Sequence, residues 1–314
     1  MKNMERIEYD RYGGPEVMLL RRFTLRKLKP DEVTVRVSAA SINPMDWKIR
    51  NGGMKLVNGF RFPRAMGTDF AGTVTAVGSA VSRFQLGDPV LGTVSMKHSG
   101  AFAPMLVTSQ RLLVKKPDSL TFAQAACLPI AGVTAWQALM KAGNLKRGQR
   151  LFVNGASGAV GQAAVTLARA EGVEVSGRVG SRSLAWAKSA GLLHVLDYAT
   201  PLPSSLSGYF DVIFDAHGSL SARDGDRLAK RGGMIIDIAP TRGKFVKALV
   251  SRSRKCLFAD VSAANLQQVV DLAAANKLVI PVSMSVSLTQ AAAVIAALER
   301  GERLNGKAII AFPA

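Results

Sequence analysis

Cysteine and histidine are scarce in this sequence. It has two cysteines, Cys127 and Cys256, which are far apart, and three equally scattered histidines, His98, His194 and His217. A zinc site needs three or four clustered ligands drawn from cysteine, histidine and carboxylate side chains. We therefore expect no bound metal. The cysteine spacing also matches neither a redox motif nor a disulfide framework.

Long hydrophobic runs are missing as well. No apolar stretch reaches the roughly 20 residues that a membrane-spanning helix needs, and the first residues lack the apolar segment of a signal peptide. Hydrophobic residues nevertheless make up 48% of the 314 residues, which is enough for a sizeable core. We expect a soluble, cytoplasmic protein with two domains.

Acidic residues are few. The chain has 22 Asp and Glu against 41 Lys and Arg, which gives a formal net charge of +19. A chain with this charge attracts anions. Its dense basic groups, at 21–29 and 251–255, are not interleaved with aromatic side chains as in single-strand binders. We expect no dedicated nucleic-acid or membrane partner, and the reason for the charge stays open.

Two rhythms divide the chain. The first ~120 residues contain short strand-like segments separated by turn residues, such as 32–40, 71–78 and 88–94, which is typical of a β-rich, barrel-like domain. From Leu151, apolar strand segments alternate with helical ones. That alternation predicts a parallel sheet covered on both faces, an α/β architecture.

The stretch VNGASGAVG (153–161) has three glycines spaced by two residues, between a strand segment and a helical one. The first glycine permits a tight turn, the second lets the backbone approach a pyrophosphate, and the third lets helix and strand pack closely. The amides at the helix start favour the phosphate charge. We predict a dinucleotide site formed by Gly155, Ala156, Ser157, Gly158, Ala159, Val160 and Gly161.

The next strand segment indicates which dinucleotide binds. NAD enzymes place an acid at its end for the ribose 2′-hydroxyl, but in residues 173–188 no acid follows Glu174. Arg178 stands at the strand end, followed by Ser181 and Arg182. Guanidinium groups form charge-assisted bonds with a 2′-phosphate, which a carboxylate would repel. The pattern favours NADPH.

Several segments together carry a family resemblance. They are YGGPEV (12–17), SINPMDWKIRNG (41–52), FPRAMGTDFAGTVTAVGSAVSRFQLGDPV (62–90), AACLPIAGVTAWQAL (125–139), NGASGAVG (154–161) and GKAIIAF (306–312). The sequence resembles the medium-chain dehydrogenase/reductase superfamily, in its zinc-free quinone oxidoreductase branch. It is especially similar to the chloroplast-envelope quinone oxidoreductase homologues and the oxoene reductases.

The resemblance implies a fold. A GroES-like substrate domain would comprise residues 1–124 and 278–314, and a dinucleotide-binding Rossmann domain would comprise 125–277. The active site would lie between them, and the protein would be a homodimer. Zinc-dependent relatives carry a cysteine where Asn43 stands and a Gly-His-Glu element where Gly67, Thr68 and Asp69 stand. The Lewis acid of those enzymes is thus not expected.

The resemblance also implies an activity, hydride transfer from NADPH to quinones or to the C=C bond of α,β-unsaturated carbonyls. Asn43 would lie near the nicotinamide and donate to a developing oxyanion. Asp46 and Lys48 would orient its loop or carry a proton. The remaining residues assigned to the cofactor are Thr134, Tyr198, Lys307 and four at the ends of two strand segments, Ala216, His217, Ala239 and Pro240.

Alternatives divide by class. A short-chain dehydrogenase needs a Tyr-x-x-x-Lys pair, and none of the four tyrosines has a lysine four residues on. An NADPH-binding protein with little turnover, in a structural or interaction role, stays open. The segment IAPTRGKFVKALVSRSRK (238–255) is more basic than the resemblance leads us to expect, which leaves the substrate unassigned.

Overall fold

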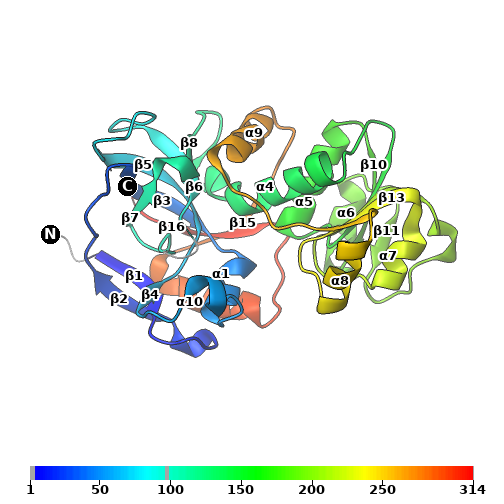
Figure 1. Cartoon of the computed structure of the whole chain (residues 1–314), viewed down its shortest axis with the longest axis horizontal. Helices are drawn as coiled ribbons and strands as arrows, with labels where there is room; N and C mark the ends of the chain where they lie inside the picture. The colour runs from blue at the N-terminus through cyan, green and yellow to red at the C-terminus, as the bar shows by residue number, and fades with distance from the viewer. Residues whose placement is uncertain (1–3, 96–98, 314) are drawn as a thin grey trace. The chain divides into compact units, whose positions relative to one another are not determined.

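The computed structural model describes residues 4–95 and 99–313, which form two compact units (Figure 1). The first unit comprises Met1–Ile130, Val261–Ala274 and Val282–Ala314, and the second comprises Ala131–Asp260 and Ala275–Pro281. The domain ranges expected from the sequence, 1–124 with 278–314 and 125–277, stay a prediction.

The first unit is built mainly of antiparallel strands. A three-stranded sheet has the order β2-β1-β4, and a seven-stranded sheet has the order β15-β16-β3-β5-β6-β8, with β7 also paired to β3. The strands are β1 (Met4–Tyr9), β2 (Leu19–Phe23), β3 (Glu32–Ser41), β4 (Arg64–Ala65), β5 (Asp69–Val77), β6 (Pro89–Thr93), β7 (Met105–Ser109), β8 (Leu113–Lys115), β15 (Val282–Val286) and β16 (Lys307–Ala311).

The centre of this unit is the long strand β3. Its alternating apolar side chains Val33, Val35 and Val37 are buried, as period-2 patterning predicts. The sheet brings distant segments together, because β3 pairs with β5 from Val33 to Ser41 and with the C-terminal β16 at 39–41. The helices of the unit are α1 (Pro44–Arg50), α2 (Lys55–Asn58), α3 (Phe122–Ala126), α9 (Ala263–Ala274) and α10 (Leu288–Glu299).

The second unit is a six-stranded parallel sheet in the order β11-β10-β9-β12-β13-β14. Its strands are β9 (Arg150–Asn154), β10 (Glu174–Val179), β11 (Val195–Asp197), β12 (Phe210–Asp215), β13 (Ala229–Asp237) and β14 (Arg254–Cys256). Its helices include α4 (Pro129–Trp136, which begins in the first unit), α5 (Ala159–Ala170), α6 (Leu184–Ser189), α7 (Ala222–Leu228) and α8 (Arg242–Val250). The predicted α/β class, a GroES-like β unit with a Rossmann-type sheet, is confirmed.

The strand order fixes where a ligand site can form. The chain passes from β9 to β10 and β11 on one side, and then returns to β12 on the other side of β9. In sheets of this kind the crevice beyond the carboxyl ends of the strands, at the point where the order reverses, receives the ligand. That point lies between β9 and β12, directly beside the glycine run.

Among the helices within residues 4–95 and 99–313, none has both the length and the apolar character needed to cross a bilayer.

Candidate functional site

The glycine run forms the turn between β9 and α5. Gly155 has a φ of 89°, a left-handed conformation that glycine adopts without strain. A Cβ on Gly161 would lie 2.1 Å from the carbonyl oxygen of Gly155, so only glycine allows the helix this close to the turn. A Cβ on Gly158 would meet nothing nearer than 3.6 Å. The tight turn and the close packing follow the prediction, and phosphate contact stays a prediction.

Open space beside Gly158 coincides with the start of α5. Gly158 is the N-cap, and the first amides of a helix have no partner inside it. These amides and the helix dipole form a ready anion site. The residues of the turn therefore fit a dinucleotide pyrophosphate.

Arg178, near the end of β10, is held by backbone carbonyl groups. Its guanidinium donates to the carbonyls of Asp197 at 3.3 Å, Tyr198 at 3.1 Å and Thr200 at 2.9 Å, and it lies over the Tyr198 ring. Arg178 thus fixes the loop after β11. By contrast, Arg182 is exposed in the turn that follows β10. Of the two arginines, Arg182 has the guanidinium with more freedom to meet a phosphate.

A carboxylate that the sequence analysis missed lies beside this turn. Asp197 ends β11, and it pairs in parallel register with Val179 of β10. Its carboxylate accepts hydrogen bonds from the Ala199 amide, at 2.9 Å, and from the Ser181 hydroxyl, and these bonds lower its pKa. The segment 175–188 itself contains no acid, as noted, but the neighbouring strand supplies one. The sheet order was needed to find it.

The predicted residues at the other strand ends gather near the glycine turn. The His217 ring lies 5.5 Å from the Tyr198 ring, and a Cβ on Gly155 would lie 2.9 Å from the His217 Cβ. Ala239 adjoins the loop after β12, because a Cβ on Gly218 would lie 2.8 Å from its carbonyl oxygen. Ala216 and Pro240 are the chain neighbours of His217 and Ala239. Thr134, buried within α4, belongs to the same unit.

The same sheet edge contains a buried ion network that the sequence analysis also missed. Asp215 ends β12 and Asp237 ends β13, and the Lys244 ammonium donates to both, at 2.6 and 2.8 Å. Arg254 pairs with Asp237 at 2.9 Å and with Asp226 at 3.0 Å. Burial alone would lower the Lys244 pKa, but the bonds to the two aspartates outweigh it and raise the pKa. The signal for this network in the sequence was the pair of apolar strand segments that each end in Asp.

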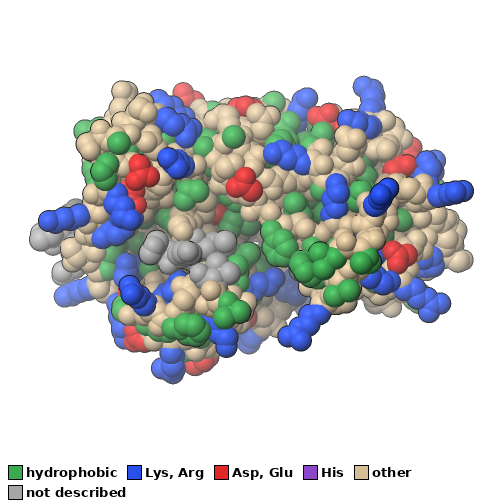
Figure 2. All heavy atoms as spheres, in the orientation of Figure 1, with side chains coloured by type: hydrophobic (Ala, Val, Ile, Leu, Met, Phe, Trp, Pro, Cys, Tyr) green, Lys and Arg blue, Asp and Glu red, His purple; other side chains and the backbone are tan. Residues whose placement is uncertain are grey.

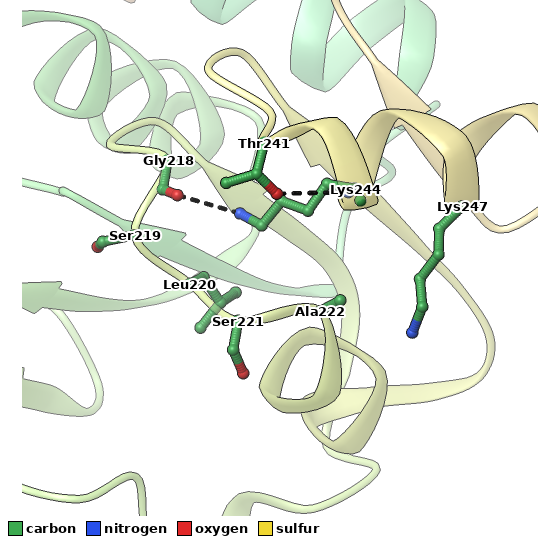
Figure 3. A pocket seen from close by; sticks show the side chains of 9 residues that line it. Gly218, Ser219, Leu220, Ser221, Ala222, Thr241, Lys244 and Lys247 are labelled. Atoms are coloured by element: carbon green, nitrogen blue, oxygen red, sulfur yellow. Dashed lines mark hydrogen bonds between the residues drawn. The ribbon is translucent and has the colours of Figure 1, made fainter.

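A hollow of about 390 Å³ lies beside this network (Figure 3). Its walls are the loop after β12 and the first turns of α8. Figure 3 shows the Lys244 side chain reaching toward the Gly218 carbonyl, to which it donates at 3.2 Å, while Thr241 caps the helix. The Lys244 ammonium is therefore bound by groups of the protein itself, and these bonds position the start of α8.

In the first unit, Asn43 lies in a buried polar cluster. Its side-chain amide donates to Asp69 at 3.1 Å and contacts the Thr68 hydroxyl at 3.4 Å, and its amide oxygen accepts from Lys307. Lys307 also donates to the Ser41 hydroxyl at 3.2 Å. The sequence analysis assigned Lys307 to the cofactor, which stays a prediction. The structure places its ammonium beside Asn43 because β16 pairs with the end of β3.

The cluster holds two carboxyl groups and one ammonium. Asp46 accepts from the backbone amide of Asn43 at 2.7 Å, a bond that caps α1, and from the Thr68 hydroxyl at 3.1 Å. Burial is the main cause that raises the pKa of Asp46 to about 7 and that of Asp69 to about 6. Lys307 opposes both shifts. Burial therefore favours the protonated form of Asp46, whose pKa lies near neutral pH, more than that of Asp69.

Lys48 does not join this cluster. It is exposed on α1, whereas Asp46 on the same helix is buried. The structure thus brings together Asn43, Asp46 and Lys307 and separates Lys48 from them. A proton-carrying role for Lys48 stays a prediction.

The described residues do not fit a zinc site. Within residues 4–95 and 99–313, no three His, Cys, Asp or Glu side chains lie close enough to hold a metal ion. His98 lies outside the described residues. The Lys307 ammonium lies against Asn43 and close to Asp69, and a cation there opposes a second one.

Comparison with known proteins gives the family. Residues 29–118 match the family described as "Alcohol dehydrogenase GroES-like domain", and residues 190–310 match the family described as "Zinc-binding dehydrogenase". The chain is 36% identical to a chloroplastic quinone-oxidoreductase homologue of Spinacia oleracea, over 76% of each chain. It is 32% identical to an NADPH-dependent alkenal/one oxidoreductase of Arabidopsis thaliana, over 75% of this chain and 62% of that one.

A solved structure supports the same family assignment. The quinone oxidoreductase from Coxiella burnetii superposes with a TM-score of 0.86 at 29% identity, covering 99% of this chain and all of that one. The resemblance inferred from the sequence is confirmed. The chain belongs to the medium-chain dehydrogenase/reductase superfamily of oxidoreductases, with quinone oxidoreductase homologues and alkenal/one oxidoreductases among its relatives.

Proposed function

We propose that this protein is an NADPH-dependent reductase that transfers hydride to quinones or to the C=C bond of α,β-unsaturated carbonyls without a metal. The observation that carries the proposal is the open space beside Gly158, which lies at the amino end of α5, where the first amides of the helix have no partner within it. The names of the relatives, which include quinone and alkenal/one oxidoreductases, support the acceptor class.

The residues of the second unit would bind and orient the cofactor. The first amides of α5 would hold the pyrophosphate. Arg182, with Ser181, would meet the 2′-phosphate, while Arg178 keeps the neighbouring loop in place. When bound, NADPH supplies the hydride. The protein supplies its position.

The residues of the first unit would act on the acceptor. Hydride addition to an enone places negative charge on the carbonyl oxygen, and a fixed hydrogen-bond donor stabilises that charge. Asn43 is held in one orientation by Lys307 and Asp69. To donate to a substrate it would give up its longer contacts, to the Thr68 hydroxyl at 3.4 Å and the Ser41 carbonyl at 3.5 Å. Asp46 and Asp69 would set the charge around it.

The test is an acceptor panel with the purified chain and NADPH, followed by loss of nicotinamide absorbance. We expect turnover of an enone and an ortho-quinone but not of the matching saturated ketone. Activity should survive a strong chelator, and metal analysis should find no stoichiometric ion. NADPH binding without turnover across the panel would instead favour the binding-protein alternative.

Asn43→Ala tests the predicted donor. We expect turnover to fall by on the order of 10²-fold, with the NADPH dissociation constant unchanged, because the amide acts on the acceptor. Thermal melting of the variant separates this effect from loss of fold. An unchanged rate would remove Asn43 from the mechanism.

A further inference from the structure

One face of α8 presents large apolar side chains to solvent. Phe245, Val246, Leu249 and Val250 are 42%, 60%, 72% and 84% exposed, and their spacing places them on one side of the helix. Figure 2 shows hydrophobic side chains gathered on the surface over α8. Single exposed apolar residues are ordinary, but a contiguous patch marks an interaction surface.

The patch faces outward because the opposite side of α8 is anchored. Lys244 is 4% exposed, and its ammonium is bound to Asp215 and Asp237 at the edge of the sheet. Rotating the helix to bury the apolar face would pull this ammonium from two buried carboxylates, which is costly. The patch is therefore a fixed feature of the fold.

Cations surround the patch. Residues 238–259 contain no Asp or Glu. Their exposed cations are Arg242, Lys247, Arg252 and Lys255. Only Lys247 among these has a carboxylate partner in the described chain, Asp226 at 3.5 Å. An apolar helix face flanked by arginine and lysine is the pattern of helices that lie in the interface of an anionic bilayer.

We propose that α8 docks this protein on membranes that carry anionic lipids. The apolar side chains would enter the boundary between headgroups and acyl chains, and the flanking cations would meet lipid phosphates. Charge favours an anionic partner over a second copy, because the patch of a second copy would carry the same excess of positive charge. A nucleic acid would contact the cations through its phosphates and would leave the aliphatic side chains exposed. The sequence analysis expected no dedicated membrane partner, because residue numbers alone do not reveal which face of 242–250 is exposed.

The test is co-sedimentation of the full chain with vesicles of phosphatidylcholine alone or with phosphatidylserine added. We expect binding only to the anionic vesicles, weakened by salt. The double variant Leu249→Gln/Val250→Gln should bind about tenfold more weakly. Its matched control, Leu86→Gln/Leu193→Gln, changes two other exposed apolar residues, 64% and 55% exposed. That control should bind as the natural chain does.

A second pair separates the patch from the overall charge of +19. Arg242→Gln/Arg252→Gln should weaken binding by roughly tenfold, whereas Arg11→Gln/Arg61→Gln, the same charge change on exposed residues of the first unit, should cost less than about threefold. Equal losses in the two pairs would overturn the proposal. The proposal would also be overturned if the natural chain did not bind anionic vesicles. If, in addition, light scattering showed that Leu249→Gln/Val250→Gln turns a dimer into a monomer, the patch would be an interface between two copies of the chain.

Discussion

At the scale of single residues, cofactor choice depends on charges within a few side chains of one turn. Arg182 is exposed after β10, and the Asp197 carboxylate lies beside Ser181 in the same turn. A 2′-phosphate attracted by the first is repelled by the second. The proposed preference for NADPH is therefore a balance, and both sides of it can be altered by substitution.

Arg182→Ala should weaken NADPH by about tenfold or more and NADH little, because only NADPH carries the phosphate. Asp197→Asn should do the reverse and tighten NADPH by a few-fold. Titration of both cofactors measures both effects. Arg231→Ala is the control, since Arg231 is an exposed arginine near the amino end of β13. Equal losses of NADPH and NADH in Arg182→Ala would contradict the assignment.

At the scale of elements, the turn between β9 and α5 separates two uses of glycine. Gly161 is required by the fold, since its Cβ would clash with a backbone oxygen 2.1 Å away. Gly158 has an extended backbone, with φ −74° and ψ 165°, that any residue adopts. The absence of a side chain at Gly158 is not needed for packing within the protein, and it leaves space for a ligand.

Gly158→Ala should therefore keep the melting temperature nearly unchanged and weaken NADPH by about tenfold or more, because the added methyl group enters the space beside the first amides of α5. Gly161→Ala should instead lower stability by about 1–3 kcal/mol. Calorimetry of folding and of NADPH binding distinguishes the two. Normal NADPH affinity in Gly158→Ala would place the pyrophosphate elsewhere.

Helix α8 depends on a single buried anchor. Lys244→Met removes the ammonium shared by Asp215 and Asp237 and should cost about 3–5 kcal/mol of unfolding free energy. Lys247→Met, one turn on, removes an exposed pair at 3.5 Å and should cost less than about 1 kcal/mol. Denaturant unfolding measures both. Similar costs would mean that the buried network contributes little.

At the scale of the whole molecule, stability should depend on pH through the buried carboxyl cluster. The pKa of Asp46 is raised from 3.8 to about 7, so the folded chain holds a proton that the unfolded chain has lost between these values. Stability from this group is therefore present at low pH and declines as pH rises from about 4 to about 7. Asp69 acts in the same direction up to about 6.

Asp46→Asn keeps an acceptor for the backbone amide of Asn43 but cannot ionise. Relative to this variant, the natural chain should lose on the order of a few kcal/mol of unfolding free energy between pH 4 and pH 8. Melting curves of both chains across that range measure the difference, which cancels the titrating groups that do not interact with Asp46. A constant difference would show that Asp46 stays ionised in the folded protein.

The sequence by itself determined the features set by short segments. Gly155, Gly158 and Gly161 specify a strand, a turn and a helix within a dozen residues. The alternating strands and helices after Leu151 specify a parallel sheet, and the motifs spread over the chain identified the superfamily. These inferences hold because they depend on spacing along the chain.

Only the tertiary structure decided which distant residues meet. The pairing of β10 with β11 sets Asp197 beside Ser181, and the pairing of β16 with β3 sets Lys307 against Asn43. The ends of β12 and β13 bring two aspartates to Lys244, which turns the apolar face of α8 to solvent. Such contacts depend on sheet order and on the direction in which each side chain points, and no local pattern contains either.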